Sequence, residues 1–154
     1  MRSSKILLVD DFAGFRRFLR SALDDPVKFH LSEAADGLEA IQKAKEFEPD
    51  LILLDIGMPG LNGIEVAKRI LKFTVPPKIL FLSLESSPDV VCAALSLGAQ
   101  GYVHKPRAQS DLLPAIGAVL NGGHFVSRGL GVSLDGNGHA GHRLNSVAAA
   151  TSTP

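Results

Sequence analysis

The sequence predicts an α/β domain in which helices cover both faces of one five-stranded parallel sheet, a three-layer, doubly wound arrangement. Short apolar runs alternate with segments of helical period from Lys5 to about Asn121. The first, third and fourth runs are apolar almost throughout, as strands buried on both faces must be. The length of 154 residues fits one such domain. The expected strands are Lys5–Asp10, Phe29–Ala34, Leu51–Asp55, Lys78–Ser83 and Gly101–His104.

Composition and charge exclude several classes of protein. Hydrophobic residues make up 45% of the chain and charged residues 21%, which is typical of a soluble globular domain. Lys and Arg number 16, as do Asp and Glu, so we expect no direct nucleic-acid binding by this chain and no membrane association. The single cysteine, Cys92, excludes an intrachain disulfide, and the apolar run before Asp10 is too short for a signal sequence. These features predict a cytoplasmic protein.

Each expected helix carries its own boundary signals. The first places Phe12 and Phe15 at helical spacing with Leu19 and Ala22, which predicts that both rings belong to the core rather than to a ligand site. The second and third open with pairs that resemble capping boxes, and the fourth opens with a serine followed by proline. These signals are Asp36 with Glu39, Asn62 with Glu65, and Ser87 with Pro88.

The fifth helix and the residues after it are less regular. Pro114 is harmless only in the first turn of a helix, so we expect Asp111 to be the cap of this helix. From Gly122 onward Gly, Ser, Asn, Ala and Thr dominate through to Pro154. We therefore expect residues 1–121 to form the domain and residues 122–154 to be a low-complexity, disordered tail without a packed fold.

Chemically active side chains follow four of the five expected strands. The first strand ends in Asp10 and Asp11, the third in Asp55, the fourth in Ser83, and Lys105 follows the fifth. Ligands of an open parallel sheet gather outside the carboxyl ends of its strands. Three carboxylates, a hydroxyl and an ammonium group are therefore expected to meet at one edge of the sheet.

This set of groups suits phosphoryl transfer to a carboxylate. Carboxylates so close repel one another, and a hard cation with oxygen ligands relieves the repulsion; Mg²⁺ is the commonest one in phosphate chemistry. Asp55 is the expected nucleophile because it stands alone at the end of the central strand, with Lys105 and Ser83 contacting phosphoryl oxygens. Taken singly, each residue has a structural alternative: the acidic pair as a helix cap, Asp55 as a turn cap, Lys105 as a loop lysine. The occurrence of all of these residues together favours a phosphoryl-transfer site.

With these residues in their order and spacing, the chain from Lys5 to about Asn121 resembles the receiver domain of two-component response regulators. The stretches that carry the resemblance are Ile6–Asp11, Asp50–Gly63, Leu82–Ser83 and Gly98–Pro106. The resemblance implies a flavodoxin-like (βα)5 fold with strand order 2-1-3-4-5. It implies that Asp55 is phosphorylated by a sensor histidine kinase or a histidine phosphotransfer protein. It also implies that Mg²⁺ is bound by Asp10, Asp11, Asp55 and the backbone carbonyl of Gly57.

The resemblance further implies that Lys105 pairs with the phosphate and that Ser83 and Tyr102 form a switch pair. A phosphoryl group adds a charge of about −1.5 to −2, which would attract Ser83 and Lys105 and leave space for Tyr102 to rotate inward. A ring half-buried at the sheet edge is the alternative for Tyr102. The face formed by the fourth helix, fifth strand and fifth helix would then change shape, and a partner or a second copy in a homodimer would bind it.

Two positions depart from the family pattern. Leu84 follows Ser83 where a small residue is usual, and its side chain could crowd the phosphoryl group. Gly57 offers no side chain to position or block a hydrolytic water.

Two other function classes stay open. A phosphatase of the haloacid-dehalogenase type also uses a strand-end aspartate, Mg²⁺ and a lysine, but it needs a second acid where this chain has Gly57. We therefore expect no enzymatic activity beyond self-phosphorylation and slow autodephosphorylation. A receiver-like binding module that signals without phosphorylation is disfavoured by retention of all the chemical groups.

The end of the chain carries two further patterns. Residues 98–127 resemble receivers that precede a helix-turn-helix DNA-binding domain, although the remaining residues lack the length, periodicity and basic charge expected of one. His124, His139 and His142 are too loosely spaced to predict a metal site.

Overall fold

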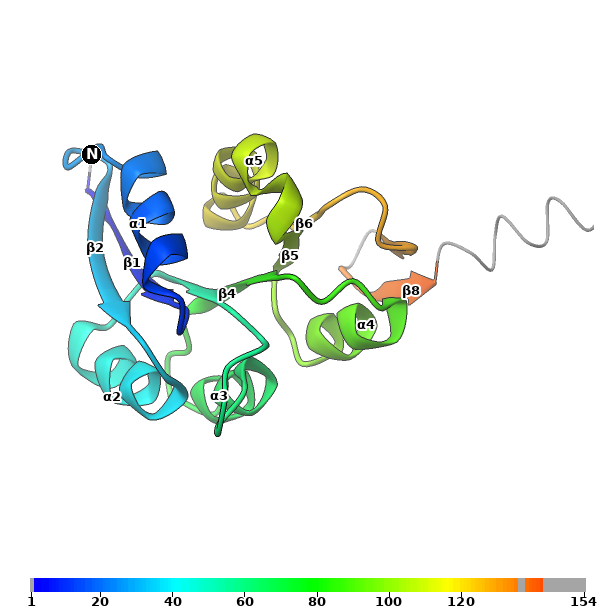
Figure 1. The fold of residues 1–154 in the computed structure, drawn as a ribbon, viewed down its shortest axis with the longest axis horizontal. Helices are drawn as coiled ribbons and strands as arrows, with labels where there is room; N and C mark the ends of the chain where they lie inside the picture. Colours follow the sequence, from blue (N-terminus) through cyan, green and yellow to red (C-terminus); the bar gives the residue numbers. More distant parts are fainter. Residues whose placement is uncertain (1, 136–137, 143–154) are drawn as a thin grey trace, which may run out of the picture.

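The computed structural model describes residues 2–135 and 138–142, and its centre is a parallel sheet with helices on both faces (Figure 1). The strand order is β2-β1-β3-β4-β5-β6, which confirms the predicted order 2-1-3-4-5 and adds one short strand. All five pairings in this sheet are parallel. The strands are β1 (Ser4–Val9), β2 (Phe29–Ala34), β3 (Leu51–Leu54), β4 (Lys78–Ser83), β5 (Gly101–His104) and β6 (Phe125–Val126).

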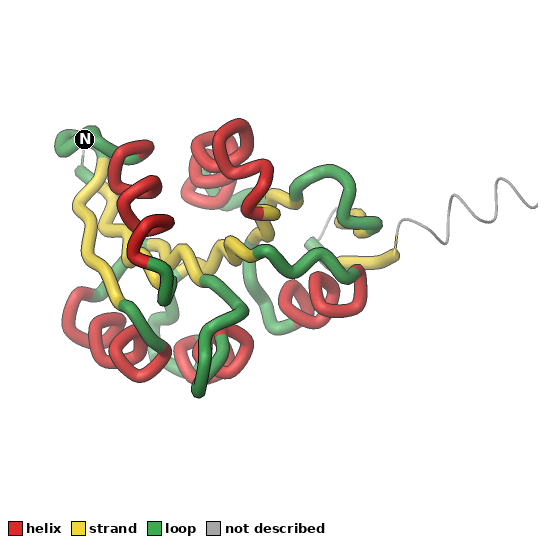
Figure 2. Tube along the Cα trace, viewed as in Figure 1, coloured by secondary structure: helices red, strands yellow, loops and turns green. Residues whose placement is uncertain are grey.

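The helices form the two outer layers, with α1 and α5 on one face of the sheet and α2, α3 and α4 on the other (Figures 1 and 2). A short 3₁₀ turn, η1 (Lys105–Arg107), leads directly into α5. The helices are α1 (Ala13–Ala22), α2 (Gly37–Phe47), α3 (Gly63–Ile70), α4 (Pro88–Ser96) and α5 (Ala108–Leu120). No helix in the described ranges combines the length and the apolar character that crossing a bilayer requires.

The central strands are buried on both faces, as their apolar sequences predict. Along β1, Leu7 and Val9 pack into the core beneath α2, α3 and α4, whereas Ile6 and Leu8 pack into the core beneath α1 and α5. This alternation follows from the period of two in a strand. It fixes the register of the strand and therefore the position of Asp10 immediately after it.

The predicted caps of α2 and α3 are confirmed. The Asp36 side chain accepts a hydrogen bond from the backbone N–H of Glu39 at 2.9 Å, and Asn62 accepts one from Glu65 at 3.0 Å. The Glu39 carboxylate in turn accepts the backbone N–H of Ala35 at 2.7 Å. These bonds satisfy N–H groups that have no partner within the helix.

Two predictions about helices were wrong. Phe12 is 66% exposed, because it is the N-cap residue of α1 and lies outside the apolar face to which Phe15 and Leu19 belong. Helix α5 begins at Ala108, so Asp111 is a buried residue of its first turn and not its cap, and Pro114 lies inside the helix. The η1 turn supplies the start of α5, and no described side chain caps this helix.

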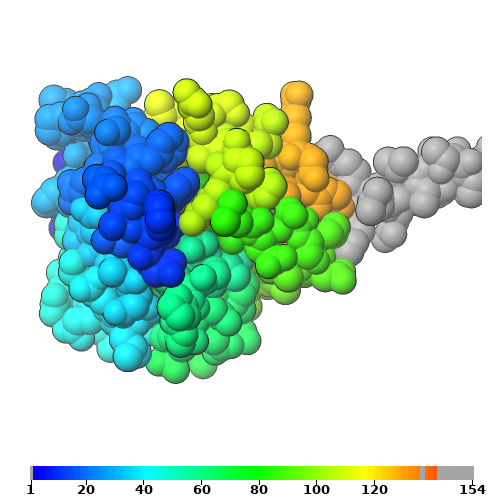
Figure 3. All heavy atoms as spheres, viewed as in Figure 1, coloured from blue at the N-terminus to red at the C-terminus, as the bar shows by residue number. Residues whose placement is uncertain are grey.

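The residues after α5 pack against the domain where the sequence predicted a disordered tail from residue 122. We call residues 122–135 and 138–142 the C-terminal segment. It contributes β6 to the main sheet and a two-stranded antiparallel sheet of β7 (Val132–Leu134) and β8 (Ala140–His142). Its buried Leu130 and Val132 join the core beneath α4, and its surface lies beside α5 and α4 in Figure 3. Its apolar residues are few and lie among many Gly and Ser residues, so composition concealed them; the rest of the predicted tail lies outside the described residues.

Candidate functional site

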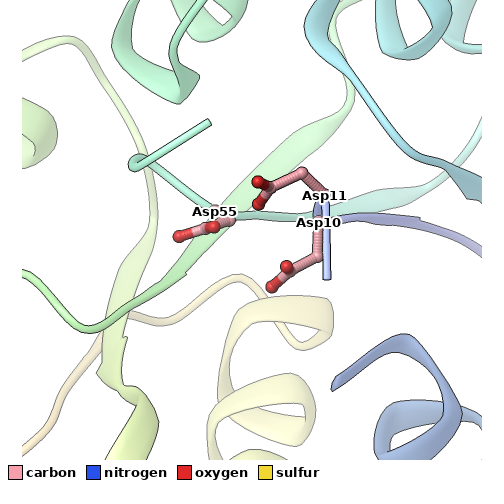
Figure 4. Close-up of side chains that lie close together, drawn as sticks. All are labelled: Asp10, Asp11 and Asp55. Atoms are coloured by element: carbon pink, nitrogen blue, oxygen red, sulfur yellow. The ribbon is translucent and has the colours of Figure 1, made fainter. Parts of the chain in front are cut away.

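The carboxyl ends of the strands bring the expected groups together. Asp10 and Asp11 follow β1, and Asp55 follows β3, its neighbour in the sheet. Figure 4 shows the three side chains gathered at this edge, and their carboxylates can each offer an oxygen within 4.8 Å of the others (Figure 4). Asp10 and Asp55 are buried, whereas Asp11 is exposed. The predicted convergence of these carboxylates is what the structure shows.

Lys105 reaches the same cluster from the end of β5. Its Nζ lies 2.6 Å from Oδ2 of Asp10 and 3.4 Å from Oδ2 of Asp55. The ammonium group also lies 4.5 Å from the centroid of the Phe15 ring, within the range of a cation–π contact. Phe15 was predicted only as a core residue. Its proximity to Lys105 could not be found from helical spacing, because the spacing gives a face and not a neighbour.

Asp55 lies in a position that disfavours its negative charge. Its residue is 5% exposed, and burial raises the pKa of its carboxyl, with a further increase from Asp10. Lys105 and a hydrogen bond from the backbone N–H of Gly57, 3.3 Å from Oδ1, lower the pKa but do not cancel the effect of burial. Burial therefore outweighs the attraction of Lys105 for the ionised Asp55 carboxylate.

The backbone around Asp55 is tightly held. Its N–H donates to the carbonyl of Val9 at 3.0 Å, which continues the pairing of β3 with β1. A Cβ at Gly63, the first residue of α3, would lie 2.0 Å from the Asp55 carbonyl oxygen. Glycine at position 63 thus permits α3 to begin directly against the residue that carries the carboxylate.

Asp10 also stabilises the start of α1. Its Oδ1 accepts the backbone N–H of Phe12 at 2.8 Å, and its backbone carbonyl accepts a hydrogen bond from Arg16 at 2.6 Å. The structural alternative for the acidic pair is therefore partly true. Asp10 orders the loop before α1 with one oxygen while its other oxygen faces Lys105.

Ser83 and Tyr102 lie close together beneath the loop between β4 and α4. Ser83 is buried and its Oγ accepts the backbone N–H of Glu85 at 3.1 Å, while the Tyr102 hydroxyl donates to the Glu85 carbonyl at 2.6 Å. The Tyr102 ring is fully buried, which rules out the half-buried ring considered as its alternative. Burial raises the pKa of Tyr102 to about 12 despite a hydrogen bond to Ser83 that lowers it.

His104 is a residue of this region that the sequence did not single out. One of its ring nitrogens, Nε2, lies 3.2 Å from the carbonyl oxygen of Leu84. Tyr102 and His104, two positions apart on β5, therefore contact successive carbonyls of the β4–α4 loop. The place of His104 at the end of β5, directly before Lys105, was the sequence signal that could have indicated its role.

A hollow of about 510 Å³ opens above the carboxylates, and a smaller one of about 260 Å³ lies beside it. Leu84, which is 70% exposed, lines both. Gly57 lines them too, and no described atom lies within 4 Å of where its Cβ would be. The larger hollow has a charged floor and a mostly apolar rim; its lining comprises Asp10, Asp11, Phe12, Phe15, Asp55, Gly57, Leu84, Lys105 and Pro106.

The donor set fits a hard divalent cation. Three carboxylates offer only oxygen ligands, which Mg²⁺ prefers to nitrogen or sulfur. Three carboxylates lie around one ammonium group, and a bound cation would relieve the repulsion between them. Lys105 and the β-strand ends fix two of the three carboxylates before any ligand binds.

Comparisons with known proteins agree on one family. Residues 6–117 match the model of the response regulator receiver domain. The chain is 34% identical over 118 residues to the chemotaxis protein CheY of Halobacterium salinarum, covering 77% of this chain and 98% of that one. It is 34% identical over 129 residues to the nitrate/nitrite response regulator protein NarL of Escherichia coli strain K12, covering 81% of this chain.

A solved structure shares the fold over most of the chain. The two-component response regulator of the LuxR family from Aurantimonas sp. SI85-9A1 has a TM-score of 0.78 and 30% identity, with 84% of this chain and 93% of that chain covered. The matched region is 58% of the length of NarL and 37% of a Rhodospirillum rubrum protein-glutamate methylesterase/protein-glutamine glutaminase. The chain thus spans about half or less of several curated relatives.

Proposed function

Because this chain belongs to the response regulator receiver domain family, we propose that it accepts a phosphoryl group on Asp55 from a phosphohistidine in a cytoplasmic relay. The donor would be a sensor histidine kinase or a histidine phosphotransfer protein. The observation that carries the proposal is the gathering of Asp10, Asp11, Asp55 and Lys105 around one hollow. Side chains from three different strands meet there in the arrangement that transfer to a carboxylate requires.

The proposed reaction is an in-line displacement at phosphorus. An Oδ atom of Asp55 attacks, an O–P bond forms, the P–N bond of the phosphohistidine breaks, and its electron pair returns to the imidazole. Lys105, whose ammonium group has three donors and lies between Asp10 and Asp55, holds one phosphoryl oxygen, and the Ser83 hydroxyl donates to another. Bound Mg²⁺, held by Asp10, Asp11, Asp55 and the Gly57 carbonyl, would neutralise the charge on the phosphoryl oxygens.

The switch would involve Ser83, Tyr102 and the surface of α4, β5 and α5. Ser83 donates its hydrogen bond to the phosphoryl group, and the loop that contains Leu84 and Glu85 follows it inward. Tyr102 and His104 already bind the carbonyls of that loop, so they would carry its displacement to β5. A partner or a second copy of the chain would then bind the altered surface.

We expect no turnover of small phosphate esters. Gly57 supplies no second acid, so the chemistry is limited to self-phosphorylation and slow autodephosphorylation. The open space at Gly57 admits water to the acceptor, while the exposed Leu84 narrows the approach from the other side.

Intact-mass measurement after incubation with acetyl phosphate and Mg²⁺ tests the proposal. We expect the natural chain and an Asp24→Asn control, which alters an exposed carboxylate, to gain one phosphoryl group. Asp55→Asn should gain none. Equal labelling of Asp55→Asn would overturn the assignment, and a natural chain that never gains mass would favour a receiver-like module that acts without phosphorylation.

A further inference from the structure

The C-terminal segment is attached to the strand that carries the switch residue. Strand β6 pairs with β5 in parallel, with Phe125 opposite Gly101 and Val126 opposite Tyr102. The ladder continues one residue further, where the backbone N–H of Ser127 donates to the carbonyl of Tyr102 at 2.9 Å. Tyr102 therefore contacts the β4–α4 loop through its hydroxyl and the C-terminal segment through its backbone.

Ser127 makes two further contacts that fix this attachment. Its Oγ accepts the backbone N–H of His104 at 3.1 Å and donates to Oδ2 of Asp111 at 2.7 Å. Ser127 is 3% exposed and Asp111 is 8% exposed, so the hydrogen bond between them is shielded from water, while the one from His104 is partly buried. We call Ser127 with His104 and Asp111 the Ser127 bridge; it joins the C-terminal segment to β5 and to the first turn of α5.

The rest of the segment covers α4. Leu130 and Val132 are buried in the same core cluster as Val91 and Leu95 of α4, and β7 and β8 lie beside that helix (Figure 1). The segment therefore occupies the outer edge of β5 and part of the surface that the proposed function assigns to output.

The acidic pocket and the Ser127 bridge meet at adjacent residues. Lys105, which contacts Asp10 and Asp55, directly follows His104, whose backbone N–H is bound by Ser127. A phosphoryl group on Asp55 would offer a new oxygen partner to the Lys105 ammonium, which now lies 2.6 Å from Asp10 and 3.4 Å from Asp55, and the backbone of Lys105 is joined directly to His104. The 3.1 Å hydrogen bond from the His104 backbone N–H to Ser127 Oγ lies one residue from Lys105, so a displacement of the end of β5 would act on it directly.

We propose that the Ser127 bridge couples the C-terminal segment to the state of Asp55, so that an occupied pocket loosens the segment and a loosened segment favours the occupied pocket. The second half follows from the first, because coupling between two sites is reciprocal. This inference rests on the proposed phosphoacceptor function. It assigns Ser127 as a positioning residue that acts through β5 and makes no contact with the phosphoryl group.

Hydrogen exchange of the natural chain, with Mg²⁺ and with or without beryllofluoride, tests whether an occupied pocket loosens the C-terminal segment. Peptides that contain Asp10 and Asp55 report binding in the pocket, and peptides from Phe125 to Leu134 report the segment. We expect slower exchange at the pocket and exchange roughly fivefold faster in the segment, at the lower end of usual coupling strengths. A protected pocket with an unchanged segment would overturn the coupling alone, whereas no response at either place would overturn the proposed function and the coupling together.

Two serine variants in the C-terminal segment test whether a loosened segment favours the occupied pocket. Ser127→Ala removes the bridge, while Ser133→Ala alters an exposed serine of β7. We expect Ser127→Ala to bind beryllofluoride more tightly, by a factor of up to about five, and Ser133→Ala to bind it as the natural chain does. A variant that had merely lost stability would bind more weakly or equally, and that result would contradict the assignment of Ser127.

Discussion

At the scale of single residues, the proposed reaction of Asp55 needs a negative charge that its position in the fold disfavours. Asp55 must be ionised to attack phosphorus, yet burial and the neighbouring Asp10 raise its pKa. Such opposition is common at functional sites, where stability is given up for chemistry. The sequence could identify Asp55 from its place at a strand end, but its burial and its distance from Lys105 depend on the folded positions of β1, β3 and β5.

The raised pKa of Asp55 gives a prediction for stability. A carboxyl whose pKa is raised in the folded state contributes stability below its ordinary value of 3.8 and loses it as the pH rises through the raised pKa. Without metal, Asp55→Asn should therefore be more stable than the natural chain at neutral pH. The difference should shrink towards pH 3. Urea unfolding at both pH values measures it, and an Asp55→Asn chain less stable at neutral pH would contradict it.

Tyr102 offers a direct reading of the switch region, because it is the chain's only tyrosine. Its buried position raises its pKa to about 12. The tyrosinate absorbance, followed immediately after a jump in pH, should show this value in the folded chain and about 10 in the urea-unfolded chain. Titration of the folded chain at the unfolded value would mean that the ring is exposed to solvent.

At the scale of elements, the junction between β3 and α3 positions the acceptor. A Cβ at Gly63 would collide with the Asp55 carbonyl, whereas at Gly117, inside α5, the added carbon would meet no described atom within 4 Å apart from its chain neighbours and the adjacent backbone of the helix. Gly63→Ala should therefore destabilise the fold by about 1–3 kcal/mol. Gly117→Ala should stabilise it by up to about 1 kcal/mol. Thermal or urea unfolding measures the stability of both variants, and equal changes in stability would show that the contact at Gly63 is unimportant.

Elements were predicted well where local and long-range signals agree. Strands β2, β4 and β5 have the expected bounds, and the caps at Asp36 and Asn62 form the expected hydrogen bonds. The predicted start of α5 was wrong because a 3₁₀ turn, which carries no strong sequence signal, replaces a side-chain cap. Strand β6 was missed because two residues have no detectable periodicity; the unpaired edge of β5 makes them a strand.

At the scale of the whole molecule, the site depends on strand order. The sheet places β1 between β2 and β3, so Asp10 and Asp55 become neighbours although 45 positions separate them in the chain. The strand ends and their residue types were enough to predict this gathering. The contacts of Phe15 and Ser127 were not predictable, because each arises from the packing of elements whose relative positions the sequence leaves open.

Magnesium should stabilise the folded chain as a whole. A cation that binds the native state alone adds about 2.7 kcal/mol at a concentration about one hundred times its dissociation constant. We expect the melting temperature of the natural chain and of Asp24→Asn to rise with Mg²⁺. Asp10→Asn and Asp55→Asn should respond much less, since each removes a proposed ligand. An equal rise in all four chains would indicate nonspecific binding away from the three carboxylates.

Identifying the residue that carries the phosphoryl group tests the central claim most directly. After incubation with acetyl phosphate and Mg²⁺, borohydride reduction converts a phosphorylated aspartate into homoserine, and peptide mass mapping locates the change. Phosphorylation through the pocket formed by Asp10, Asp11, Asp55 and Lys105 predicts that the change occurs at Asp55 alone. Reduction at Asp10, at Asp11 or at a carboxylate elsewhere, with Asp55 intact, would contradict it.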